Sequence, residues 1–310
     1  TRETVINSPA GARRETARHG GETWRDPRGF VPYAPSAPME IRGVDFSGSR
    51  RPGEDIWIAT GQLEGDRLRI ERCRSAAEQF DGAGREPMLR ALRRTLERSD
   101  GATGLDVSFG LPAELLPDRI EGWRGATRWF AAAFADTDAP AMRERLKSAA
   151  RSLPGEGVEL KRRTDRTVGA NSPYSFITYY QTLYGIREVL APLVESGSVS
   201  VPPMDAPGER NAIEVYPAGT LRRLGTVDTG YKDGADGAAA KRREILDRLS
   251  GTDAGGIVVD LPASIGDTAA KEPGGDALDS VVAAVATARA ARAGFGTDRP
   301  YDDREGFIYV

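Results

Sequence analysis

The chain has 310 residues, of which 39% are hydrophobic and 29% are charged, a balance typical of globular proteins and unlike that of disordered, collagen-like or coiled-coil chains. One cysteine and one histidine argue against a disulfide framework, Cys- or His-rich zinc sites, and Ser-His-Asp or Cys-His catalysis. A net charge of −3 provides no general basic field for nucleic acid. Any chemistry must therefore come from carboxylates, hydroxyls, Lys or Arg side chains, or a carboxylate-bound metal.

Residues 1–38 are rich in Gly, Pro and Arg and carry no helical or strand periodicity. We interpret them as a disordered or non-native N-terminal extension, with Met39 as the natural start. The sequence contains no run of eighteen uncharged apolar residues and no apolar segment of a secretory signal. We therefore expect a cytoplasmic protein with no membrane partner.

Hydrophobic patterning predicts a mixed order of strands and helices from residue 41 onward. Strands are expected at 41–47, 55–60, 67–74 and 104–109, with a helix at 86–99. A helical insert at about 112–205 includes a helix near 140–151 and an aromatic-rich helix from Tyr174 to Glu195. A strand at 211–216, a helix at 237–250, a strand at 256–260 and a helix at 276–292 follow. This order predicts one α/β domain, 39–310, whose mixed sheet is flanked by helices.

Three acids, Asp45, Asp106 and Glu214, interrupt predicted strands between apolar neighbours. Because strand side chains alternate, each acid faces away from those neighbours, either toward solvent or into a covered face where it needs a partner or a metal. Turn-forming residues follow each acid, in the sequences DFSGS, DVSFGLP and EVYPAG. Ligands collect at the ends of strands in α/β sheets, so we expect the three acids to converge.

Two further acids, Asp276 and Asp279, lie three residues apart on one face of the final predicted helix. Asp276 could instead cap that helix, an alternative that explains Asp279 less well. Clustered carboxylates repel one another, by roughly 4 kcal/mol for a pair about 4 Å apart at an effective dielectric of 20. They must share protons or bind cations, and all-oxygen ligands favour Mg²⁺ or Mn²⁺.

The motifs GVDFSG, LDVSFGLP, IEVYPAG and DALDSVVAAVATA, with the closing EGFIYV, resemble the family catalogued as domain of unknown function 429 (DUF429), over residues 39–310. The resemblance implies an RNase H-like fold and a nuclease activity that is itself a prediction for the family. It implies that Asp45 is the first-strand acid, Asp106 the central-strand acid, and Asp276 and Asp279 the final-helix acids of a metal site, with Glu214 lining the same pocket. Tyr216 stands where many members carry His, so a proton-transfer role of that His is not expected here.

Candidate substrate contacts are Arg162, Arg163 and Lys232, which could bind phosphate. The run Lys241-Arg242-Arg243 could form a basic edge or a solvated helix face. The aromatic residues between 174 and 184 could stack on unpaired bases, but their helical spacing favours core packing. We expect a nucleic-acid partner, DNA or RNA, bound with moderate and salt-sensitive affinity.

We hypothesise a divalent-metal-dependent nuclease or phosphodiesterase. One alternative is a nucleotide phosphotransferase of the actin-like fold, which also begins with an acid before a Gly/Ser turn, although this chain is short for two such subdomains. Another is a catalytically inert RNase H-like binding or scaffold module.

Overall fold

The computed structural model describes residues 38–80, 84–155, 157–232, 237–251 and 254–310. The expectations for the N-terminal extension, apart from residue 38, lie outside the described residues. Those described belong to one compact unit that includes the predicted insert. Within these ranges, none of the helices combines the length and the apolar character that crossing a membrane requires.

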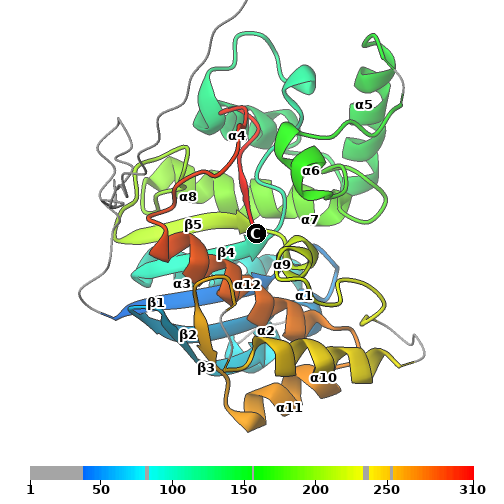
Figure 1. The fold of residues 1–310 in the computed structure, drawn as a ribbon. Helices are drawn as coiled ribbons and strands as arrows, with labels where there is room; N and C mark the ends of the chain where they lie inside the picture. Colours follow the sequence, from blue (N-terminus) through cyan, green and yellow to red (C-terminus); the bar gives the residue numbers. More distant parts are fainter. Residues whose placement is uncertain (1–37, 81–83, 156, 233–236, 252–253) are drawn as a thin grey trace, which may run out of the picture. The chain divides into compact units, whose positions relative to one another are not determined.

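A seven-stranded mixed sheet, in the order β6-β3-β2-β1-β4-β5-β7, organises this unit (Figure 1). Strand β2 runs antiparallel to both β1 and β3, and the other neighbouring pairs are parallel. The strands are β1 (Met39–Asp45), β2 (Trp57–Glu64), β3 (Arg67–Ser75), β4 (Gly101–Asp106), β5 (Arg210–Val215), β6 (Val258–Asp260) and β7 (Ile308–Tyr309). The predicted α/β class and mixed sheet are confirmed.

Strands β1 and β4 each end at an acid, two or three residues earlier than predicted. They are parallel neighbours, and their register pairs Asp45 with Asp106. The same register pairs Gly43 with Gly104, two residues before the acids and therefore on the same face of the sheet. Two glycines followed by two acids thus lie side by side at the carboxyl edge of β1 and β4.

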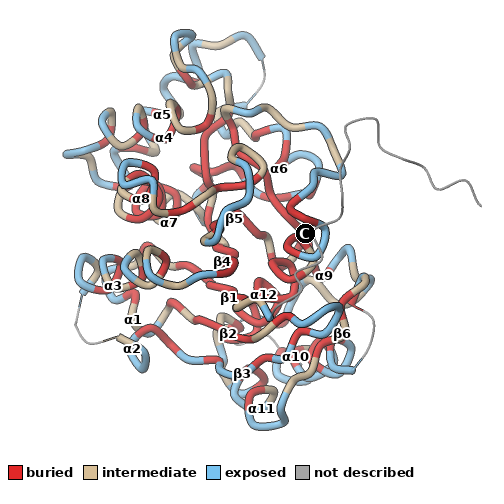
Figure 2. The backbone as a smooth tube through the Cα atoms, turned by 90° about the vertical axis from the view of Figure 1, so that its left-hand side faces the viewer, coloured by how far each residue is buried: buried red, intermediate tan, exposed pale blue. Residues whose placement is uncertain are grey.

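Helix α12 (Asp276–Arg292) covers this face and contacts β1, β2 and β4. Fourteen of its 17 residues are buried, so it is the central helix of that layer, as Figure 2 also shows. A Cβ at Gly43 would lie 2.1 Å from the backbone nitrogen of Ala284, and one at Gly104 would lie 2.1 Å from Thr287 Oγ1. The two glycines therefore allow α12 to pack directly against the strand backbones.

Three other helices share the α12 side of the core, namely α9 (Pro217–Arg223), α10 (Ala238–Leu249) and α11 (Ala263–Lys271). The opposite side of the sheet packs against α3 (Arg85–Arg98), α7 (Tyr179–Tyr184) and α8 (Ala191–Ser196), with α4 (Gly122–Ala133) and α5 (Ala139–Arg151) beyond them. Shorter helices are α1 (Pro52–Asp55), α2 (Ala76–Gln79), α6 (Arg163–Val168) and a 3-10 turn, Ala113–Leu115. Helices thus flank both faces of the sheet.

The aromatic-rich helix predicted from Tyr174 begins at Tyr179 instead. Residues 173–178 form turns, because the Thr178 hydroxyl donates to the Ser172 carbonyl at 2.6 Å and bonds the Ser175 hydroxyl at 2.9 Å. Between α7 and α8 the helix widens into a π-helical turn, Gly185–Leu190. The turns at 173–178 lie beside the acidic end of β1 and matter for the site.

Candidate carboxylate metal site

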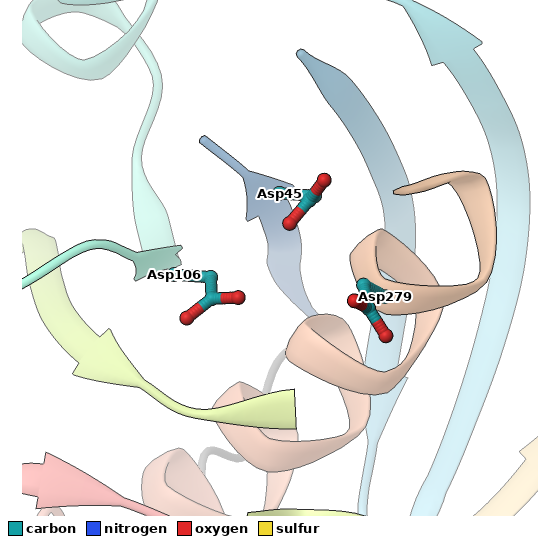
Figure 3. Close-up of side chains that lie close together, drawn as sticks. All are labelled: Asp45, Asp106 and Asp279. Atoms are coloured by element: carbon teal, nitrogen blue, oxygen red, sulfur yellow. The ribbon is translucent and has the colours of Figure 1, made fainter. Parts of the chain in front are cut away.

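Three carboxylates converge from two strands and one helix (Figure 3). Asp45 ends β1, Asp106 ends β4, and Asp279 lies in the first turn of α12. One oxygen atom of each lies within 4.8 Å of the others, and Asp45 and Asp279 are 6% and 1% exposed. The structure therefore brings together three of the five acids singled out in the sequence.

The entry to α12 explains why Asp279 reaches this cluster. Gly275 occupies the N-cap position with a left-handed φ of +83°, and the Glu272 carboxylate accepts from the backbone N–H groups of Gly274 (2.6 Å) and Ala277 (3.2 Å). Glu272, not Asp276, thus bonds a free backbone N–H group in the first turn of this helix. Asp276 is therefore not the N-cap residue, although it lies in the first turn, where an acid favours the helix dipole, and its side chain lines the pocket beside the cluster.

Tyr231 and Lys232 hold Asp279 from the other side. The Tyr231 hydroxyl donates to Asp279 Oδ1 at 2.8 Å, and the Lys232 ammonium forms an ion pair with Asp279 Oδ2. Lys232 Nζ also lies 3.9 Å from Asp276 Oδ1. Each carboxylate oxygen has two lone-pair directions, so Asp279 keeps acceptor capacity toward the cluster.

Burial and mutual repulsion make the ionised cluster costly. Burial raises the pKa of Asp45 well above its usual value, an effect that Lys232 opposes and that Asp279, Asp276 and Asp106 reinforce. Burial and the charge of Asp279 raise the pKa of Asp106 to about 8, and burial raises the pKa of Asp276 to about 6. Burial alone would lower the pKa of Lys232, but the attraction of Asp279 and Asp45 raises it. Without further positive charge, the cluster retains protons near neutral pH.

Glu214 lies beside the cluster but is bound to Arg162. Both side chains are buried, with Arg162 1% exposed. Arg162 Nη1 and Nη2 donate to the two Glu214 oxygens at 2.7 and 2.5 Å, and Nε and Nη2 donate to Asp165 at 3.0 and 2.7 Å. The second Nη1 hydrogen goes to the Glu305 carbonyl at 3.2 Å. All five N–H groups of Arg162 are thereby used.

This geometry corrects two predictions. Arg162 is not a phosphate contact, because its donors are taken by protein acceptors. Glu214 lines the pocket, as predicted, but as a positioning residue, because its oxygens accept from Arg162 and from the backbone N–H of Phe109 at 2.9 Å. Through that last bond, the pair holds the loop that follows Asp106.

The other candidate contacts divide between surface and core. The Lys232 side chain is 44% exposed and lines the pocket, and Arg163 is exposed outside it, so both remain predictions as phosphate contacts. The prediction of a basic edge at residues 241–243 is wrong for Arg242, which is buried and donates to the carbonyls of Tyr231 and Ala270 at 2.6 and 2.9 Å. Arg242 thereby anchors the segment that carries Lys232.

Asp45, Asp106, Glu214 and Asp276 line a pocket of about 390 Å³. Its polar lining also includes hydroxyl and amide side chains, from Ser47, Ser108, Asn171, Thr178, Gln181 and Tyr216. Apart from Tyr216, sequence reasoning assigned no role to these groups, and it also missed Tyr231 and Glu272. Tyr231 had one signal, its position next to Lys232 in the sequence.

One comparison with known proteins gives a match. Residues 190–305 match the family model described as "Protein of unknown function (DUF429)". The matched range contains Glu214, Lys232, Asp276 and Asp279, whereas Asp45 and Asp106 precede it. Neither the curated proteins nor the solved structures contain a significant match.

Proposed function

We propose that this chain, whose residues 190–305 match the DUF429 family model, is a divalent-metal-dependent phosphodiesterase that cleaves nucleic acid. The observation that supports this proposal is the convergence of Asp45, Asp106 and Asp279, each with an oxygen within 4.8 Å of the others. With Asp276 added, four carboxylates face the single ammonium group of Lys232. Such an excess of buried negative charge favours the uptake of cations.

The residues fit Mg²⁺ or Mn²⁺. Every donor in the cluster is a carboxylate oxygen, and the cluster contains no imidazole or thiolate that would favour zinc. The raised pKa values of Asp45 and Asp106 reflect a cost that a divalent cation would remove. When bound, such an ion supplies an activated water and stabilises the leaving oxygen of a phosphodiester.

The protein's own groups divide the remaining work. Asp45, Asp106 and Asp279 hold the ion, and Tyr231 and Lys232 orient Asp279. Hydroxyl and amide groups in the pocket, among them those of Ser47, Ser108 and Asn171, are available to donate to phosphate oxygens.

The topology also supports an RNase H-like arrangement. The first strand and a central strand carry adjacent acids, and the last long helix adds acids from its first turn. These are the positions that the motif resemblance implies for Asp45, Asp106, Asp276 and Asp279. Only Glu214 departs from a direct role.

Calorimetric titration of Mn²⁺ into metal-free protein tests the proposal. We expect saturable binding that is lost in Asp45→Asn and Asp279→Asn, while Asp267→Asn, an exposed acid on α11, binds like wild type. Asp45→Asn replaces a buried carboxyl group whose ionisation is disfavoured, so this metal-free variant should unfold at the same or a higher temperature than wild type. Asp279→Asn also loses the ion pair with Lys232 and should unfold at a lower temperature, so the stability control rests on Asp45→Asn. Loss of metal binding without loss of stability cannot come from misfolding.

The outcomes also separate the alternatives. Mn²⁺ uptake that is equal in wild type and both site variants would contradict the carboxylate site. Metal binding without cleavage of any single- or double-stranded DNA or RNA would favour the inert module. Stabilisation by ATP would favour the phosphotransferase.

A further inference from the structure

Two large apolar side chains project into solvent next to the carboxylate pocket. Phe176 and Ile177 are 76% and 73% exposed, and no other large hydrophobic residue in the described ranges is comparably exposed. Both lie in the turns at 173–178 that precede α7. Contiguous exposed apolar side chains on a globular protein commonly mark a binding surface.

The turns and the carboxylate pocket form one continuous surface. Ile177, Thr178 and Gln181 line the pocket together with Asp45 and Asp106. Gln181 Nε2 donates to the carbonyl of Phe46 at 2.5 Å, one residue after Asp45. A Cβ at Gly48 would lie 2.4 Å from the Tyr180 carbonyl oxygen, so the loop after β1 packs directly against α7. The exposed side chains are therefore held at a defined position relative to the acids.

Phe176 begins a row of aromatic rings, Phe176, Tyr179, Tyr180 and Tyr184, called the aromatic row below. Successive ring centroids are 6.3, 4.6 and 6.3 Å apart. The guanidinium of Arg143 lies 5.9 Å from the Phe176 ring and 5.7 Å from the Tyr179 ring. Tyr184 is buried and belongs to the core, whereas Phe176 is exposed and Tyr179 and Tyr180 are half-buried. Core packing thus accounts for one end of the row and not for the other.

The occupant that fits this combination is a strand with unpaired bases. Aromatic faces stack on bases of any sequence, guanidinium groups attract both base faces and phosphates, and a duplex hides its base faces inside the stack. Arg50 and Arg51, in the loop after β1, are exposed and add positive charge to that loop. The chain's net charge of −3 gives little general attraction for phosphates, so base stacking has to supply part of the affinity.

We propose that the aromatic row, with Phe176 as its outermost ring, binds the unpaired bases of single-stranded nucleic acid and leads the strand into the carboxylate pocket. This inference deepens the proposed function and rests on it for the fate of the bound strand. It assigns single strands, and not duplexes, as the substrate class.

Fluorescence anisotropy with labelled ten-nucleotide strands in EDTA tests the proposal, because binding is then read without cleavage. The strands are oligothymidylate, oligouridylate, an abasic ten-mer with the same phosphates, and a ten-base-pair duplex. We expect wild type to bind oligothymidylate about tenfold more tightly than the abasic strand, which corresponds to ~1.4 kcal/mol. Phe176→Ala should abolish that difference, and the oligouridylate arm reports whether RNA is bound equally well.

Two matched variants separate stacking from simple apolar contact. Phe176→Leu keeps apolar area but removes the ring and should behave like Phe176→Ala, whereas Phe176→Trp should retain the preference. Because the side chain is exposed, all three variants should unfold at the wild-type temperature.

Several results would overturn the proposal. Wild type could bind thymidylate and abasic strands with equal affinity, or bind the duplex more tightly than the single strand. Phe176→Leu could bind oligothymidylate with wild-type affinity. Sedimentation could show that wild type is a dimer and that Phe176→Ala dissociates it. Failure of the proposed function has a different signature. Base-dependent binding would persist in EDTA while Mn²⁺ calorimetry showed no binding at the acids.

Discussion

Replacing Gly43 by alanine tests how closely the candidate site depends on the packing of α12 against β1. The new Cβ would lie 2.1 Å from Ala284 N and 2.2 Å from Ser280 O, both backbone atoms of a buried helix. The strand and the helix would have to separate by about 0.9 Å before the shorter contact reached 3.0 Å, the distance below which real Cβ atoms essentially never approach another atom. No side-chain rotation can relieve this clash.

Overpacking of a core costs ~1–3 kcal/mol, and we expect Gly43→Ala near the upper end because the opposing atoms are backbone. The same displacement moves Asp279 away from Asp45, since Ser280 is its neighbour on α12. Altering the support of metal ligands typically costs about 10- to 100-fold in metal affinity, so the Kd for Mn²⁺ should rise by roughly one to two orders of magnitude.

Urea unfolding and Mn²⁺ calorimetry measure the two effects, with Gly125→Ala as the matched control. At Gly125, inside α4, the nearest atom to a new Cβ is Ile120 Cγ2 at 3.6 Å, an ordinary contact. That variant should gain ~0.5–1 kcal/mol from helix propensity and bind Mn²⁺ normally. If Gly43→Ala is as stable as wild type, the packing argument is wrong. If it is destabilised but binds Mn²⁺ normally, the approach of α12 does not set the geometry of the site.

Two further predictions concern buried charge. In metal-free protein, Asp106 of the native state has a pKa of about 8, whereas in the unfolded chain it loses its proton at about pH 4. Between these pH values only the native state binds this proton, so the free energy of unfolding should fall as pH rises from about 4 to 8. The free energy of unfolding should change by at most ~1.4 kcal/mol per pH unit for this one proton. Urea unfolding at several pH values should show a smaller pH dependence in Asp106→Asn than in wild type, and an identical pH dependence would contradict the assignment. Arg162→Gln leaves Asp165 and Glu214 buried without a cation and should destabilise the protein by ~3–5 kcal/mol, whereas exposed Arg163→Gln should change stability by less than ~0.5 kcal/mol. Equal urea midpoints for those two variants would show that the buried pair contributes little.

Local patterns predicted the elements that carry the acids. Asp45 and Asp106 each lie between two apolar neighbours in a predicted strand and precede turn-forming residues, and both signals act within a few residues. The final helix was predicted at 276–292, the bounds that the structure has, because Gly274 and Gly275 precede a long small and apolar segment. Strand β7 was missed because two residues carry too little periodicity, and its pairing with β5 is non-local.

The roles of individual side chains depended on contacts between distant segments. Arg162 and Glu214 looked like site residues in the sequence, but they lie 52 positions apart and bond each other in the core. Asp276 and Asp279 were both assigned to the metal site, and the positions of Tyr231 and Glu272 show how their surroundings differ.

The sequence by itself thus determined the α/β class, the carboxylate chemistry and the strand ends where the acids lie, because alternation, turn residues and composition act locally. The tertiary structure alone decided which acids meet, which cations oppose them and which aromatic ring remains in solvent. Those outcomes depend on the register of β1 with β4 and on how closely α12 approaches two glycines.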